Sequence, residues 1–141
     1  MAARWHRARW AILWPLAALI LLLPTQRASA APRDSAPSRS QVRNYKAGLE
    51  AWTAALDKKD PDDRDEQLAK AESRFDAALD GPSKFPEALL SLALVRYTRN
   101  HIIEAEPLFQ QVAETTEGAM RAEALTYLGL INLRRDRKSV V

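Results

Sequence analysis

The sequence predicts an all-α protein whose helices pair into repeated antiparallel hairpins. From Gln41 onward, apolar residues recur at helical spacing and Ala, Leu, Glu and Arg dominate. No stretch alternates β-branched with polar residues, and glycine is scarce. The strongest observation is internal repetition, because the helical segments at residues 69–82 and 103–116 match position by position.

Residues 1–30 have the features of a cleaved secretory signal peptide. Three arginines precede an apolar run at residues 11–23, and Ala28 and Ala30 frame a cleavage site after residue 30. As a helix, that run spans only about 20 Å, short of the roughly 30 Å bilayer core. We therefore expect an exported protein of the bacterial periplasm, with no stable membrane insertion after cleavage. The alternative is an uncleaved signal that tethers the chain to the membrane.

The charge of the chain changes once this segment is removed. Residues 1–30 hold four of the 21 basic residues and no acidic one, so 17 basic and 18 acidic residues remain, a net charge of −1. Such a balance gives no electrostatic basis for binding nucleic acid. The chain also lacks cysteine, which excludes disulfides, thiol catalysis and cysteine-based zinc sites.

Residues 31–40 combine Pro, Ser, Ala and charge without periodicity, which predicts a flexible linker. The first helix is expected at residues 42–56, with Tyr45 and Trp52 on one face together with Leu49 and Leu56. For the two aromatic residues we favour core packing over contact with a partner.

The acidic segment at residues 60–66 is expected to be a solvated loop that leads into a helix at Leu68. An EF-hand loop that began at Asp60 would need Gly at its sixth position and Glu at its twelfth, where this chain has Asp65 and Ala71. A calcium loop is therefore not predicted.

Each of the two matching segments carries a small, a large and a small-to-medium apolar residue at spacing i, i+4, i+7. This spacing places the three side chains on one stripe of a helix. The matched pairs, all at the same offset, are Ala71 with Ala105, Phe75 with Phe109, and Ala78 with Val112. The preceding helices match as well, at a slightly longer offset: Leu89 with Leu125, Leu92 with Leu128, and Ala93 with Gly129. Small residues at the last pair would let a neighbouring helix approach closely.

Local signals predict where these helices end and begin. Gly81-Pro82 is expected to stop one helix through a left-handed glycine, and Pro86 to be the first residue of the next. Asn100 occupies the turn between two helices and tolerates the left-handed conformation. A further helix is expected to open at Ala122.

On these residues the chain resembles the tetratricopeptide repeat family, whose unit is a helix–turn–helix. The units would be residues 41–82, residues 83–119 and a partial unit at residues 120–135. The chain departs from the family in having Asn100 for the usual inter-helix glycine, a longer first turn, and no final proline in the second unit. The resemblance implies a right-handed α-solenoid of about two and a half repeats.

The resemblance also implies a function, because the first helices of such repeats line a concave groove that holds a protein or peptide partner. Positions carried over from the family give a largely apolar groove with acidic edges, which suits an apolar or amphipathic segment. A C-terminal carboxylate grip is not expected, since Leu90 and Leu94 occupy the positions of its Lys and Asn. The alternative for these two leucines is packing between repeats. The lining residues are Glu87, Leu90, Leu94, Tyr97, Thr98, Glu123, Thr126, Leu130 and Leu133.

The sequence predicts no catalytic, cofactor-binding or metal-binding residue, and the protein is not expected to be an enzyme. His101, the one histidine beyond the predicted signal, is interpreted as a turn residue, and no phosphate loop, nucleophile elbow or HExxH motif occurs. We expect a scaffold or protein-interaction module. The alternatives are the N-terminal region of a longer exported enzyme, such as a protease, and self-association through the open end of the repeats.

The last six residues, DRKSVV at 136–141, do not continue the repeat pattern. A widely used sequencing adapter encodes the same six residues in one frame. We therefore expect them to be adapter read-through, with the native chain continuing beyond Arg135. A genuine short basic tail is the alternative.

Overall fold

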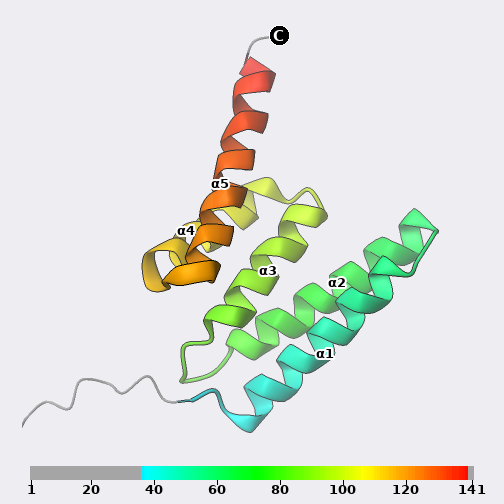
Figure 1. Cartoon of the computed structure of the whole chain (residues 1–141). Coiled ribbons are helices and arrows are strands. Elements are labelled where there is room, and N and C mark those ends of the chain that lie inside the picture. Colours follow the sequence, from blue (N-terminus) through cyan, green and yellow to red (C-terminus); the bar gives the residue numbers. More distant parts are fainter. Residues whose placement is uncertain (1–35, 140–141) are drawn as a thin grey trace, which may run out of the picture. The chain divides into compact units, whose positions relative to one another are not determined.

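Five helices and no strand make up residues 36–139, the part of the chain that the computed structural model describes (Figure 1), which confirms the all-α prediction. The helices are α1 (Arg39–Leu56), α2 (Pro61–Leu79), α3 (Pro86–Thr98), α4 (Ile102–Thr115) and α5 (Gly118–Ser139). The predicted signal peptide, linker residues 31–35 and residues 140–141 lie outside the described part. No helix within residues 36–139 is long and apolar enough to cross a bilayer.

Each helix packs against the next one in the chain, and α1 and α2 form the longest pair (Figure 1). α3 lies at the centre of this arrangement and is buried along most of its length. Leu92 and Val95 of α3 join the core between α1 and α2, whereas Leu89, Leu90 and Ala93 join the core with α4 and α5. One helix therefore connects the two main hydrophobic cores.

The six residues of the repeated stripe are all fully buried, as their spacing predicts. The side chains are Ala71, Phe75 and Ala78 on α2 and Ala105, Phe109 and Val112 on α4. Phe75 lies against α1, where Gly48 provides the space for its ring: a Cβ at Gly48 would lie 2.6 Å from Cε1 of Phe75. The rings of Tyr45 and Trp52 lie 5.7 Å and 6.2 Å from that of Phe75, so both aromatics pack at the core as expected. Leu49 and Leu56 of the same predicted face are exposed.

α1 begins at Arg39, inside the segment expected to be linker. Ser38 and Gln41 form a capping box, in which each side chain accepts a hydrogen bond from the backbone N–H of the other. The buried Gln41 amide also donates to the carbonyl oxygens of Ala78, at 3.1 Å, and Ser83, at 3.0 Å. The start of α1 is thus fixed by contacts with residues about forty positions away in the sequence.

The prediction of a loop at residues 60–66 is wrong, because this segment forms the first turns of α2. Asp60 caps the helix by accepting hydrogen bonds from the backbone N–H groups of Asp62 and Asp63, and Pro61 is the first helical residue. Asp62 and Asp63 lie at the positive end of the helix dipole. The side chains of the segment are exposed, so it is solvated but helical.

Of the predicted turn residues, Asn100 and Pro86 are confirmed and Gly81 is not. Asn100 has φ 64°, the left-handed conformation, and Pro86 opens α3. Gly81 does not have a positive φ, since Gly118 is the one glycine that does within the described residues. Its lack of a side chain serves close packing instead: a Cβ there would lie 2.3 Å from Cδ of Gln41.

The buried face of α5 differs from the one that the repeat pattern predicts. Leu125 is 51% exposed and a Cβ at Gly129 would meet no atom within 4 Å, whereas Ala124 and Ile131 are buried. The buried face is therefore rotated by about one residue, because α5 packs mainly on α4 and touches α3 only slightly. α5 also begins at Gly118 instead of Ala122 and continues to Ser139.

Candidate functional site

The structure divides the nine predicted groove residues into a packed set and an exposed set. Leu90 is buried, and Leu94 and Tyr97 are half-buried against the core of α3, α4 and α5. Leu90 and Leu94 therefore pack between helices, which was the alternative to lining the groove. The exposed set contains Glu87 and Thr98 on α3 and Glu123, Thr126, Leu130 and Leu133 on α5.

Tyr97 takes part in an aromatic cluster that joins three helices. Its ring lies 5.0 Å from that of Tyr127 on α5, edge to face, and the Tyr127 ring stacks on Phe109 of α4 at 5.0 Å. The guanidinium carbon of Arg134 lies 4.9 Å from the centre of the Tyr97 ring, within cation–π distance. These contacts determine which face of α5 points inward.

The outward face of α5 carries large apolar side chains that no described helix covers. Leu130 is 41% exposed and Leu133 is 58% exposed. With Thr126 they lie on the side of the helix away from Ala124 and Ile131, as the helical period requires. Two members of the predicted groove thus form an exposed apolar stripe on α5.

A groove of about 610 Å³ lies where the start of α4 meets the second half of α5. Three isoleucines give it an apolar wall, and arginines of α5 line its edge. None of the nine predicted residues contributes, because the rotation of α5 was not visible in the sequence. The lining residues are Asn100, Ile102, Ile103, Glu106, Ile131, Arg134, Arg135 and Arg137.

A network of arginines and carboxylates joins α2 to the end of α3. Arg96 Nε donates to Glu72 Oε1 at 2.8 Å, and Arg99 Nη1 donates to Glu72 Oε2 at 2.6 Å. Arg99 also makes a two-pronged contact with Asp65, at 2.9 and 3.1 Å, and Arg96 reaches Asp76 at 3.3 Å.

These contacts set the ionisation of the network. Burial raises the pKa of Glu72, but the hydrogen bonds from Arg96 and Arg99 outweigh burial and hold that pKa below its usual value. The hydrogen bond from Arg99 likewise lowers the pKa of Asp65. For Asp76, burial and the negative charges of Glu72 and Asp80 raise the pKa despite Arg96.

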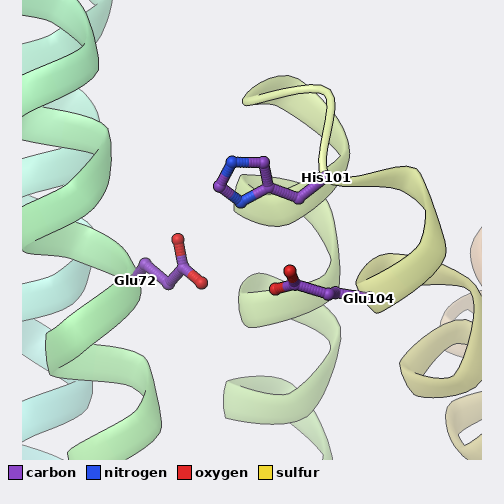
Figure 2. Close-up of side chains that lie close together, drawn as sticks. All are labelled: Glu72, His101 and Glu104. Atoms are coloured by element: carbon purple, nitrogen blue, oxygen red, sulfur yellow. The ribbon is translucent and has the colours of Figure 1, made fainter.

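His101 lies at the edge of this network, immediately before α4. Its side chain and those of Glu72 and Glu104 point into one shared space (Figure 2), and each offers a ligand atom within 4.8 Å of the other two. The Nδ1 atom of His101 is buried and has no hydrogen-bond partner among residues 36–139.

Sequence reasoning missed this cluster, although one part of its signal was present. His101 and Glu104 have the i, i+3 spacing that places two side chains on one face of a helix. Glu72 lies about thirty positions earlier on α2, and only the packing of α2 against α3 and the turn after it brings this carboxylate into reach.

No protein-family model, curated protein or solved structure matches this chain. The functional argument therefore depends on the geometry of the chain itself.

Proposed function

We propose that this protein is an exported, tetratricopeptide-like interaction module that binds an apolar or amphipathic helical segment of another protein. The proposal combines the resemblance of the repeated residues with the signal-like features of residues 1–30. The observation that carries it is the exposed apolar stripe of α5, where Leu130 and Leu133 are uncovered.

Exposed large apolar residues are common singly, but several along one helix favour association. Leu125 on a neighbouring side of α5 is exposed as well, and so is Ile103 of α4, at 89%. An amphipathic helix could lay its apolar face along such a surface by placing anchors at i, i+3 or i+4 and i+7. Arginines beside the groove between α4 and α5 would favour a partner with acidic residues next to those anchors.

The test is a selection of binding peptides from a random helical library displayed on phage, followed by affinity measurement. We expect the selected peptides to be amphipathic and to bind the Leu130→Ser/Leu133→Ser variant at least about tenfold more weakly, since each buried leucine contributes about 1.5–3 kcal/mol. Leu56→Ser is the matched control, because Leu56 is 74% exposed but lies on α1. Equal binding by wild type and the α5 variant would refute the assignment of this surface.

The alternative is that the chain is the N-terminal region of a longer exported enzyme. The nucleotide sequence of the gene distinguishes this alternative from an interaction module. A catalytic motif encoded in frame after the codon for Arg135 would favour the enzyme and would make the repeats its accessory domain. Self-association is a third outcome, and light scattering over a range of chain concentrations distinguishes it from binding to a different protein.

A further inference from the structure

We infer that Glu72, His101 and Glu104 form a binding site for one divalent transition-metal ion, with Zn²⁺ the best match. This inference does not depend on the proposed function, since the site lies on α2 and at the junction of α3 and α4.

The backbone brings the three side chains together. The left-handed Asn100 ends α3, and the N–H of His101 then donates to the Arg96 carbonyl at 2.8 Å, which holds the turn against the end of α3. Glu104 follows in the first turn of α4, where its N–H donates to the His101 carbonyl at 3.2 Å. Figure 2 shows the His101 ring facing both carboxylates. Its Nδ1 atom, the ring nitrogen nearer to Cβ, is directed toward them.

The state of His101 Nδ1 points to a ligand. In the described part of the chain this buried nitrogen has no hydrogen-bond partner. A buried polar atom in a native protein is nearly always paired or bound to water or an ion. It also lies close to two carboxylates without forming a hydrogen bond to either, although every ligand atom of the cluster is within 4.8 Å of the others. An ion placed among the three atoms would pair all of them.

The charge around the site has the sign and size that a divalent cation would neutralise. The ion-pair network that includes Glu72 and Glu104 holds four carboxylates, from Asp65, Glu72, Asp76 and Glu104, and the two guanidinium groups of Arg96 and Arg99. The net charge of these groups when ionised is −2. Arg96 binds Oε1 and Arg99 binds Oε2 of Glu72, and each of these oxygens keeps a second lone pair for a metal.

The ligand types select the metal. One imidazole nitrogen and two carboxylates suit zinc and similar transition metals, whereas calcium and magnesium prefer sites made of oxygen alone. Tetrahedral zinc with bonds of about 2.0–2.2 Å places its ligand atoms roughly 3.4 Å apart. Ligand atoms up to 4.8 Å apart must therefore close by up to about 1.4 Å. Glu104 can make this movement, because its side chain is 59% exposed and its nearest ion pair, with Arg96, is 3.8 Å long. Water would complete the coordination on the open side.

The experiment is a titration of the purified chain, prepared without a polyhistidine tag, with Zn²⁺ in competition with a chromogenic chelator. We expect one ion per chain, and affinity at least about tenfold lower in His101→Gln and in Glu104→Gln, since each removes a ligand. Glu114→Gln, an exposed carboxylate at the other end of α4, is the matched control. This control should bind as wild type does.

Two further readouts separate a metal site from a general loss of structure. Without metal, Glu104→Gln should melt close to wild type, since it loses only a long, exposed ion pair and a charge in the first turn of α4. Zn²⁺ should raise the melting temperature of wild type and not of the variant. In NMR spectra, Zn²⁺ should shift the Nδ1 resonance of His101. Absence of stoichiometric binding, wild-type affinity in His101→Gln, or loss of binding in Glu114→Gln would each overturn the inference.

Discussion

The contact between Gly48 and Phe75 gives a sharp test of how α1 packs on α2. Replacing Gly48 by alanine adds a Cβ 2.6 Å from Cε1 and 2.7 Å from Cδ1 of the Phe75 ring, both far inside van der Waals contact. The ring is fully buried and held by Tyr45 and Trp52, so it cannot simply rotate away. Either the two helices separate or the ring leaves its preferred rotamer.

The magnitude follows from two opposing effects. Overpacking of a well-filled core costs about 1–3 kcal/mol, whereas alanine in place of a mid-helix glycine gains about 0.5–1 kcal/mol. We expect Gly48→Ala to lower the free energy of unfolding by about 1–2 kcal/mol and the melting temperature by about 5–10 °C. Gly129→Ala is the matched control, because a Cβ there meets nothing within 4 Å, and it should stabilise the chain by about 0.5–1 kcal/mol.

The assay is urea unfolding followed by circular dichroism, with Phe75→Leu added to complete a double-mutant cycle. Leucine vacates part of the space of the ring, so the double variant should be more stable than the sum of the single effects predicts, by about 1 kcal/mol. A Gly48→Ala variant at least as stable as wild type, or strict additivity in the cycle, would refute the close approach of the two helices.

Three further predictions concern single contacts. The pKa of Glu72 in the folded chain lies below its ordinary value of 4.5, so the stabilisation from this group is present above pH 4.5 and is lost as pH falls through the folded pKa. Below about pH 4, the unfolding midpoint of wild type should therefore fall more steeply with pH than that of Glu72→Gln. Parallel curves for the two proteins would contradict this. Gln41→Ala removes two buried hydrogen bonds and the capping-box bond from the Ser38 N–H, and should cost about 2–3 kcal/mol in urea unfolding. This is two to three times the effect expected for Asn44→Ala, which removes one hydrogen bond. Asn100 has φ 64°, which alanine adopts only with strain, so Asn100→Ala should lower the free energy of unfolding by about 1 kcal/mol. Asn100→Gly should leave the free energy of unfolding nearly unchanged in the same assay. Equal effects of the two substitutions would argue against the left-handed turn.

The accuracy of the sequence predictions depended on how local their signals were. The stripe of Ala71, Phe75 and Ala78 was found correctly because its spacing alone fixes which residues share a helix face. The segment at residues 60–66 was misassigned because its charges suggested a loop, although Asp60 followed by Pro61 is a strong helix start. Helix capping chemistry outweighed overall polarity there.

The candidate sites were harder to predict than the helices. Of the expected groove residues, Leu130 and Leu133 are exposed on α5, whereas Leu90 is part of the core. Helical periodicity separates the faces of a helix, but it does not say which face meets the neighbouring helix. The rotation of α5 by about one residue therefore exchanged Leu125 for Ala124 in the buried set.

The sequence by itself determined the helical class, the repeated apolar stripe and the turn at Asn100, since all three depend on residues within a few positions of each other. The tertiary structure alone decided the orientation of α5, the anchoring of Gln41 between α1 and α2, and the meeting of Glu72 with His101 and Glu104. These features depend on contacts between different helices, such as Tyr127 with Phe109 and Glu72 with His101, and those contacts exist only after the helices have packed.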